Sequence, residues 1–353
     1  MVIKSSMFYN SSVGGTFSSV ARPMRLAVLL LATLLVVFPG PASAGQKVRV
    51  AVISDLNNGY GSTSYSNAVD RAVDAIIKLA PDLVISAGDM VAGQRIPHLS
   101  ESTVNAMWQA FHHAVTEPLQ AARIPLAVTP GNHDGSGYHG FEKERETYRD
   151  QWQQRKPPLN FIDDSRYPFD YAFEKSDVMF VSLDVTVTGM LGRDQKRWLR
   201  QLLEKAGKHY RYRVVFSHLP LWPFAHGRES EYTGDQELES ILREGNVELY
   251  LSGHHHAFYP GFKDDLHLVS LSCLGSAPRK LLGTGRVSDR TFLFLEFDNV
   301  IRMAALTPKE EPALVNWQML PEKITSKVAV IQRADLVSSS LKPLELSESK
   351  AGQ

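Results

Sequence analysis

The chain has 353 residues, of which 43% are hydrophobic and 22% charged, an ordinary composition for a soluble globular protein. This excludes a disordered chain, a collagen and a coiled-coil rod. The 38 basic and 38 acidic residues cancel, so no global field favours nucleic acid or an anionic membrane. The single cysteine, Cys273, excludes an internal disulfide.

The amino terminus has the three-part layout of a secretory signal peptide. Two arginines flank the start of an apolar run from Leu26 to Phe38, and Ala42-Ser43-Ala44 forms an A-x-A cleavage site. We predict that residues 1–44 are a signal peptide, with Met24 as an alternative start, and that the protein is exported to a bacterial periplasm. The apolar run is short for a membrane span, so an uncleaved anchor is the weaker alternative and no span is expected after cleavage.

Beyond the signal, short apolar runs alternate with amphipathic helical patterns, which predicts an α/β domain over residues 45–307. Helical spacing predicts helices around 69–77, 101–122, 198–206 and 238–242. Eight runs rich in β-branched or aromatic residues are predicted strands: Val48–Ile53, Leu83–Ser86, Leu126–Val128, Val178–Leu183, Val214–Phe216, Val247–Leu251, Leu266–Leu271 and Phe292–Phe297. Residues 308–353 are expected to form an extension whose last part, 338–353, is poorly ordered.

Side chains that can bind metal ions directly follow five of the predicted strands. They are Asp55 and Asn57, then Asp89, then Asn132 with His133 and Asp134, then His218, and finally His254-His255-His256. The carboxyl ends of strands border the ligand crevice in open α/β sheets, so these residues are expected to converge. Oxygen donors mixed with imidazole suit Mn, Fe, Zn or Co better than calcium. Six or more donors favour two ions that share a carboxylate.

Each of these residues has a structural alternative when taken alone. Asp and Asn are common turn residues, and a buried histidine often makes hydrogen bonds in a core. The order and placement of the whole set favour a metal-binding or catalytic role over a structural one. Within the histidine run, residues two apart point the same way on an extended segment, so His254 and His256 can ligate together while His255 points away.

The ordered set resembles the calcineurin-like metallophosphoesterase superfamily, whose motifs are D-x-H, G-D, G-N-H-D/E, a lone H and G-H-x-H. The resemblance covers about Val48 to Phe297. It implies a four-layer α/β/β/α sandwich of two mixed β-sheets flanked by helices. It also implies a hydrolase of phosphoric esters with two divalent ions, in which a hydroxide held by the metals attacks phosphorus.

The resemblance also implies a role for each matching residue. Asp55 and His256 would bind the first ion, and Asp89 would bridge both ions. The second ion would be bound by Asn132, His218 and His254. His133 would stabilise developing charge or protonate the leaving oxygen, and Asp134 would orient it.

One position departs from the family pattern, because the first motif ends here in Asn57 rather than histidine. A carboxamide oxygen is a weaker and harder donor. Asn57 therefore ligates, or leaves a position for water, or the first site fills only when substrate arrives. Purple acid phosphatases would carry a tyrosine shortly after the G-D motif, where this chain has Met90-Val91-Ala92, so that subtype and its colour are not expected.

Four residues are weaker candidates for substrate contacts: Ser62, Thr63, His226 and Arg279. Ser62 and Thr63 lead into a predicted helix that their hydroxyls could cap and whose amides could meet a phosphate. His226 and Arg279 lie in loops after predicted strands. A simple turn or a solvated side chain is the more favoured reading for each of the four.

The predicted function is hydrolysis of a small-molecule or envelope-derived phosphomonoester or phosphodiester. A non-catalytic metal-dependent binding protein on the same fold is the alternative, supported by Asn57 and opposed by His133 and Asp134. A nuclease is disfavoured because no run of Lys or Arg is present, so no nucleic-acid partner is expected. The sequence gives no prediction of the oligomeric state.

Overall fold

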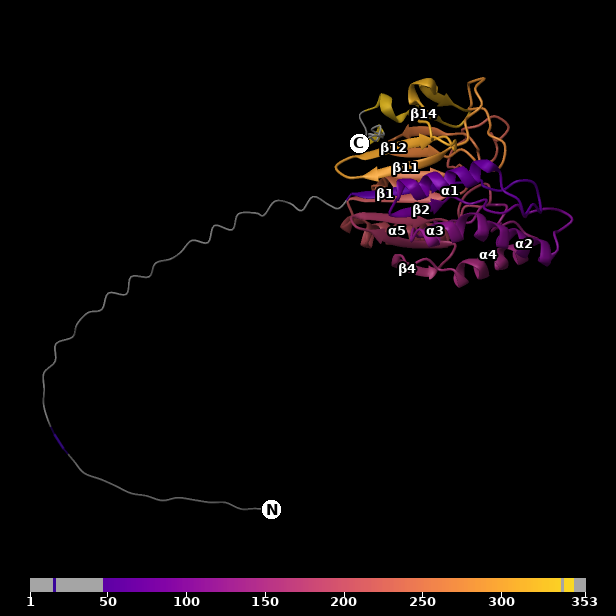
Figure 1. Cartoon of the computed structure of the whole chain (residues 1–353). Helices are drawn as coiled ribbons and strands as arrows, with labels where there is room; N and C mark the ends of the chain where they lie inside the picture. Colours follow the sequence, from indigo (N-terminus) through magenta and orange to yellow (C-terminus); the bar gives the residue numbers. More distant parts are fainter. Residues whose placement is uncertain (1–14, 17–46, 338–339, 346–353) are drawn as a thin grey trace, which may run out of the picture. The chain divides into compact units, whose positions relative to one another are not determined.

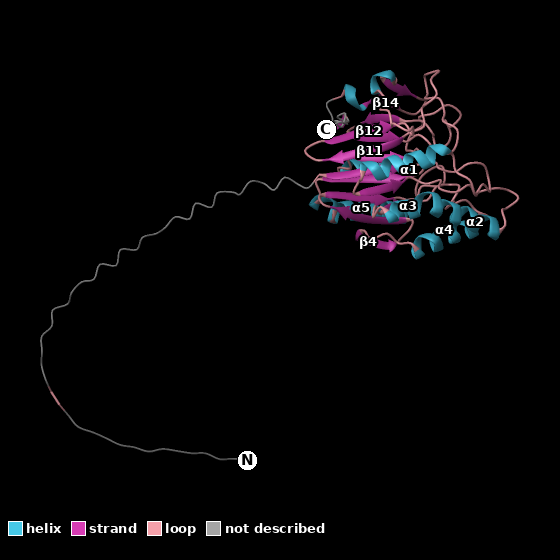
Figure 2. Cartoon of the chain, in the orientation of Figure 1, coloured by secondary structure: helices cyan, strands magenta, loops and turns pink. Residues whose placement is uncertain are grey.

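The computed structural model describes residues 15–16, 47–337 and 340–345. Two mixed β-sheets pack face to face and carry helices on their outer sides (Figures 1 and 2). The four-layer sandwich predicted from the sequence is confirmed. The predicted signal peptide lies outside the described residues, apart from residues 15–16. Within the described ranges, no helix is both long enough and apolar enough to span a membrane.

The first sheet has six strands in the order β15-β12-β11-β1-β2-β3. Strands β1, β2 and β3 are parallel, and β11 runs antiparallel to β1. Their bounds are β1 Val48–Ile53, β2 Leu83–Ser86, β3 Leu126–Val128, β11 Phe292–Phe297, β12 Ile301–Leu306 and β15 Leu341–Pro343.

The second sheet has nine strands in the order β13-β14-β9-β10-β8-β7-β6-β5-β4. Its central strands β10, β8, β7 and β6 are parallel. The bounds are β4 Asn160–Arg166, β5 Asp170–Lys175, β6 Val178–Ser182, β7 Tyr212–Ser217, β8 Leu249–Ser252, β9 Tyr259–Lys263, β10 Leu266–Ser270, β13 Lys323–Thr325 and β14 Val330–Arg333. Each sheet therefore contributes a parallel set of strands whose polar residues follow the carboxyl ends.

Two groups of helices form the outer layers. In the first group α1 contacts α3, and α2 contacts α4; in the second α5 contacts α6. A five-residue π-helical segment joins α2 to α3, so the predicted helix over 101–122 is one interrupted run. The bounds are α1 Asn67–Leu79, α2 Glu101–Phe111, the π segment His112–Thr116, α3 Glu117–Ala121, α4 Glu142–Gln154, α5 Arg193–Lys205 and α6 Gln236–Glu244, with short 3₁₀ turns at Gly207–His209, Trp317–Met319 and Ala334–Leu336.

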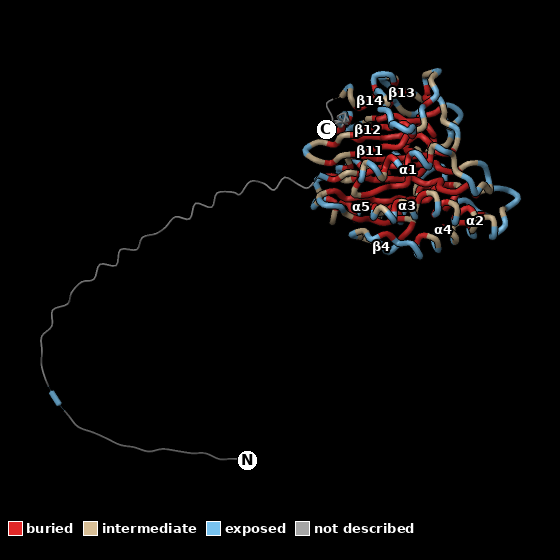
Figure 3. The backbone as a smooth tube through the Cα atoms, viewed as in Figure 1, coloured by how far each residue is buried: buried red, intermediate tan, exposed pale blue. Residues whose placement is uncertain are grey.

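The core lies between the two sheets, where most strand residues are buried (Figure 3). The ring centroid of Phe180 in β6 lies 6.0 Å from that of Phe297 in β11. The hydroxyl of Tyr171 in β5 donates to the carbonyl of Val128 in β3 at 2.7 Å and accepts from its N–H at 2.9 Å. Apolar burial and this hydrogen-bonded pair hold the sheets in register beneath the polar edge.

All eight predicted strands are present, with bounds that agree to within two residues. The prediction missed α4 because its apolar stripe is almost absent, with only Tyr148 and Trp152 as large buried apolar residues. The prediction that residues 338–353 are poorly ordered is wrong for Leu341–Pro343, which pair with β12. Residues 338–339 and 346–353 lie outside the description. The extension after residue 307 also supplies β13 and β14 to the second sheet.

Candidate metal centre

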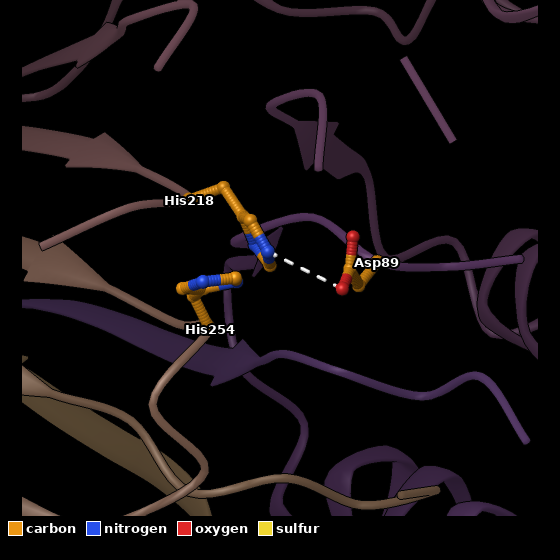
Figure 4. Close-up of side chains that lie close together, drawn as sticks. All are labelled: Asp89, His218 and His254. Atoms are coloured by element: carbon orange, nitrogen blue, oxygen red, sulfur yellow. Dashed lines mark ion pairs between the residues drawn. The ribbon is translucent and has the colours of Figure 1, made fainter. Parts of the chain in front are cut away.

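Three buried side chains from different strands meet at the polar edge of the sandwich. Asp89 follows β2, His218 follows β7 and His254 follows β8, and their exposed fractions are 1%, 0% and 7%. Figure 4 shows the ring of His218 directed toward Asp89, with the ring of His254 beside that of His218. One potential donor atom from each of the three lies within 4.8 Å of the others. Residues far apart in the sequence therefore form one group, as the strand-end argument predicts.

Three further predicted ligands adjoin this group. His218 Nε2 lies 3.0 Å from Asn132 Oδ1 and 3.3 Å from Asp89 Oδ2. His256 Nε2 lies 3.0 Å from Asp55 Oδ1, an oxygen that makes no hydrogen bond with any described residue.

These spacings fit divalent ions. Donor atoms bound at right angles about 2.1 Å from one ion lie about 3.0 Å apart. The separations of 3.0 Å at Asp55–His256 and at Asn132–His218 match that value. Mixed oxygen and imidazole donors suit Mn, Fe, Zn or Co. The residues present therefore fit the metals that the sequence predicts.

The second ring nitrogen of each of these histidines is already used by an acceptor. His218 Nδ1 donates to the Ala87 carbonyl at 2.8 Å, and His256 Nδ1 donates to the Ala277 carbonyl at 3.1 Å. His254 Nε2 lies 2.8 Å from Glu231 Oε2. These acceptors place a proton on the nitrogen that they contact, so the opposite nitrogen is the one that a metal ion could use. Histidines that bind metals typically have such a partner.

The backbone turns sharply where the strands end. Asp55, Asp89, His254 and His256 have φ values of 53°, 55°, 64° and 51°, in the left-handed region. That region costs non-glycine residues about 1–2 kcal/mol each, and such residues cluster at functional sites. Four of the predicted ligands therefore carry this strain, although other residues such as Ala80 and Ser176 share the conformation.

Close backbone approach explains two glycines of the motifs. A Cβ at Gly131 would lie 2.1 Å from Asp89 N, and one at Gly253 would lie 2.1 Å from Ser54 Oγ. Neither distance is compatible with a side chain. Gly131 and Gly253 therefore allow the segments that carry Asn132 and His254 to lie against the neighbouring strand ends.

Charge pairing keeps the central carboxylate ionised in the interior. Burial raises the pKa of Asp89, but His218 and His133 outweigh burial and hold that pKa well below its usual range. Burial lowers the pKa of His218, but Asp89 and Asp55 raise it to about 9. Opposite charge dominates over desolvation at both groups, so this position is suited to a cation.

The model of the calcineurin-like phosphoesterase family matches residues 48–258. The chain belongs to this family.

Two curated relatives show how far the likeness extends. Purple acid phosphatase 23 of Arabidopsis thaliana is 26% identical over 247 residues, which cover 62% of this chain and 49% of the relative. Serine/threonine-protein phosphatase CPPED1 of Bos taurus is 27% identical over 226 residues, covering 58% of this chain and 64% of the relative. The chain thus spans about half to two thirds of these relatives.

Solved structures share the fold at low identity. Purple acid phosphatase PPD1 from yellow lupin has a TM-score of 0.58 at 16% identity, covering 77% of this chain and 53% of that one. A dimetal phosphatase from Danio rerio has a TM-score of 0.51 at 15% identity, covering 76% and 99%. GAP50 of Plasmodium, described as the anchor in the inner membrane complex, has a TM-score of 0.52 at 16% identity, covering 76% and 89%.

His133 lies beside the candidate metal centre rather than among the buried predicted ligands. Its Nδ1 lies 3.2 Å from the Gly93 carbonyl, to which it donates, and its Nε2 lies 3.9 Å from Asp89 Oδ2. The side chain keeps 22% of its exposure, and its ring centroid lies 5.3 Å from that of Tyr60. The outward nitrogen is therefore the one that can exchange a proton with a ligand.

The prediction that Asp134 orients His133 is wrong. Asp134 Oδ1 accepts from the N–H of Gly131, and Asp134 Oδ2 accepts from the N–H of Met90, both at 2.6 Å. The Gly93 carbonyl orients the His133 ring instead. Asp134 fastens the loop after β3 to the loop after β2, a contact that sequence spacing does not reveal.

Asn57 has two partners of its own. Its Oδ1 accepts from Ser276 Oγ at 3.0 Å, and its Nδ2 lies 3.4 Å from the Val91 carbonyl. The carboxamide oxygen keeps a second lone pair, so ligation by Asn57 stays a prediction.

The weaker candidates for substrate contacts lie in different surroundings in the structure. The cap position of α1 is Ser66, which makes no side-chain capping bond, so Ser62 and Thr63 do not cap this helix. Ser62 lies 3.1 Å from Ser64, hydroxyl to hydroxyl. His226 Nδ1 lies 3.5 Å from Glu229 Oε1 on the surface. Arg279 donates its backbone N–H to the carbonyl of His256 at 3.0 Å, which places it beside a predicted ligand.

Sequence reasoning missed Glu231, which lies 23 positions before His254 in a loop without motif spacing. Its carbonyl also lies 2.8 Å from His255 Nε2, and His255 Nδ1 accepts from the Phe224 N–H at 3.0 Å. Backbone groups thus use both nitrogens of His255, which explains why the middle histidine points away from the ligand group.

We expect Asp134→Ala to lower both stability and metal content. The variant leaves the buried N–H groups of Met90 and Gly131 without a partner, which costs about 1–3 kcal/mol each, and it frees the loops that carry Asp89 and Asn132. Denaturant unfolding and elemental analysis would measure the two effects. Asp82→Ala is the control, because Asp82 accepts from the Arg49 N–H at 2.8 Å away from the centre. An Asp134→Ala protein that keeps its metal and loses only turnover would restore the orienting role.

We expect Glu231→Ala to weaken metal binding by about 10- to 100-fold, because His254 loses the partner that fixes its tautomer. Glu231→Gln keeps an acceptor oxygen and should lose less. Titration against a competing chelator measures the affinity. Glu229→Ala, in the same loop and exposed, is the matched control. Equal affinities for Glu231→Ala and Glu229→Ala would contradict this role.

Proposed function

We propose that the protein is a metal-dependent phosphoesterase, which hydrolyses a phosphomonoester or phosphodiester. The observation that carries the proposal is the position of His133 beside six converging donor residues. The His133 Nδ1 donates a hydrogen bond to the Gly93 carbonyl. The side chain is partly exposed, and its Nε2 lies 3.9 Å from Asp89 Oδ2. A site that only holds a cation has no need of such a side chain.

The ions would be held by Asp55, Asp89, Asn132, His218, His254 and His256. When bound, divalent ions stabilise charge on a phosphoryl group and lower the pKa of water near them. His133 can hold a proton at Nε2 and pass it to the leaving oxygen, while Nδ1 stays bonded to the Gly93 carbonyl. The exposed ring of Tyr60 lies beside the His133 ring, with a centroid distance of 5.3 Å.

The second candidate is a non-catalytic binding protein on the same fold. The fold by itself does not decide the activity. GAP50, which has the same fold, is described as an anchor. Asn57, in place of the histidine of the first motif, is the feature of this chain that favours the second candidate.

The expected substrate is a small-molecule or envelope-derived phosphoester, and the expected location is the bacterial periplasm. The signal-like segment before Gly45 supports that location. Fractionation followed by amino-terminal sequencing would test it, with Gly45 as the expected first residue. A protein retained in the cytoplasm with residues 1–44 intact would contradict it.

The activity test uses protein stripped of metal and reloaded with Mn, Fe, Zn or Co. We expect metal-dependent hydrolysis of p-nitrophenyl phosphate or its bis ester. His254→Ala should lose metal and activity together. His133→Ala should keep its metal and lose about 100-fold or more in turnover, the usual contribution of a proton donor. Turnover that persists in stripped protein, or in His254→Ala, would contradict the proposal.

A further inference from the structure

Two loops, 225–231 and 276–282, pair with each other beside the metal centre. Ala225 and Leu281 form an antiparallel bridge, and the His226 N–H donates to the Lys280 carbonyl at 2.9 Å. Each loop also carries one arginine, Arg228 in the first and Arg279 in the second. The pairing brings these two cations into one neighbourhood.

Each loop is fastened to a different histidine of the centre. Glu231 of the first loop pairs with His254 Nε2 at 2.8 Å. In the second loop, the Ala277 carbonyl accepts from His256 Nδ1 at 3.1 Å, and Arg279 donates its N–H to the His256 carbonyl at 3.0 Å. The two arginines therefore flank the predicted ion sites and are fixed to them by short connections.

The two guanidinium groups differ in their partners. Arg228 makes an ion pair with Glu231, and its Nε is enclosed and unpaired. The Arg279 Nε is also enclosed, and its guanidinium has no hydrogen bond or ion pair to any part of the chain that the structure describes. A buried donor without a partner costs about 1–3 kcal/mol. The guanidinium of Arg279 is thus available to bind an anion.

The positive charge of Arg228 acts on the guanidinium of Arg279. Burial lowers the pKa of Arg279, and the positive charge of Arg228 lowers it further, while Glu231 and Asp55 oppose that change. The guanidinium stays charged in any protein environment. An anion bound between the two cations would offset their mutual repulsion.

The neighbouring residue argues against a merely solvated arginine. Lys280 is exposed, whereas Arg279 is half-buried. Successive side chains of an extended segment point to opposite sides. Lys280 therefore directs its charge to solvent, and Arg279 directs its charge inward.

Resting on the proposed function, we propose that Arg279 binds a terminal oxygen of the substrate phosphoryl group and selects phosphomonoesters over phosphodiesters. A monoester has three terminal oxygens and is a dianion at neutral pH. When two of these oxygens face the metal ions, the third is left for a guanidinium. A diester replaces that oxygen with an ester oxygen and its substituent, which offers the cation far less charge. Guanidinium matches phosphate with paired, charge-assisted hydrogen bonds.

The test compares Arg279→Ala and Arg279→Lys with the control Lys280→Ala, which removes the adjacent charge. Binding of inorganic phosphate to metal-loaded protein is measured by calorimetry. Separately, kcat/KM is measured for p-nitrophenyl phosphate and for bis(p-nitrophenyl) phosphate. For Arg279→Ala we expect phosphate affinity and monoester kcat/KM to fall by about 10- to 100-fold, the range of one charged hydrogen-bonded contact. The diester should lose much less, Arg279→Lys should recover part of the loss, and Lys280→Ala should match the wild type.

The outcomes separate this inference from the proposed function. Equal losses on both esters, or unchanged phosphate affinity in Arg279→Ala, would overturn the role of Arg279. Equal losses of phosphate affinity in Arg279→Ala and Lys280→Ala would mean that any nearby positive charge has the same effect. That result would also overturn the specific role of Arg279. If the wild type hydrolyses neither ester, the proposed function fails, and the phosphate titration still decides whether Arg279 binds the anion.

Discussion

The buried carboxylate of Asp89 is the constraint on which the rest of the site depends. A charge in a protein interior is strongly destabilising unless it is paired and hydrogen-bonded. Here Asp89 Oδ1 accepts from the His133 N–H at 2.9 Å, and His218 lies 3.3 Å from Oδ2. The partners come from loops after β3 and β7, so one carboxylate at the end of β2 links both sheets. Its backbone carbonyl extends the link by accepting from the N–H of Leu56 at 2.9 Å.

Pairing the buried Asp89 carboxylate requires unusual backbone conformations that the surrounding strands hold in place. The left-handed turns at Asp55 and His254 re-aim side chains at the point where the chain leaves each sheet. Such turns persist only when the surrounding structure fixes them. The apolar strands fix these turns, since strand residues such as Val52, Ile85 and Leu251 are fully buried. The sheets hold the loop residues in place, and the loops carry the chemistry.

The sequence predicted features whose physical cause is local. A short run of β-branched or aromatic residues bounded by turn residues favours a buried strand, and the glycines of the motifs stand at the close approaches seen at Gly131 and Gly253. Features that depend on tertiary contacts were missed or misassigned. The edge strand β4 is partly exposed and polar, so it lacks an apolar signal. The partners of Asp134 and of Glu231 lie in other loops, and no spacing rule connects them.

The departure at Asn57 is best understood through the loop that it contacts. Ser276 Oγ lies 3.0 Å from both the side-chain and the backbone oxygen of Asn57. One residue earlier, the Gly275 N–H donates to the Asp55 carbonyl at 2.9 Å, and a Cβ there would lie 1.9 Å from the Leu56 carbonyl oxygen. The segment that begins the Arg279 loop is therefore packed directly on the first motif. An imidazole at position 57 would remove the carboxamide oxygen that Ser276 uses, so in this chain the first motif also holds a loop that bears a cation.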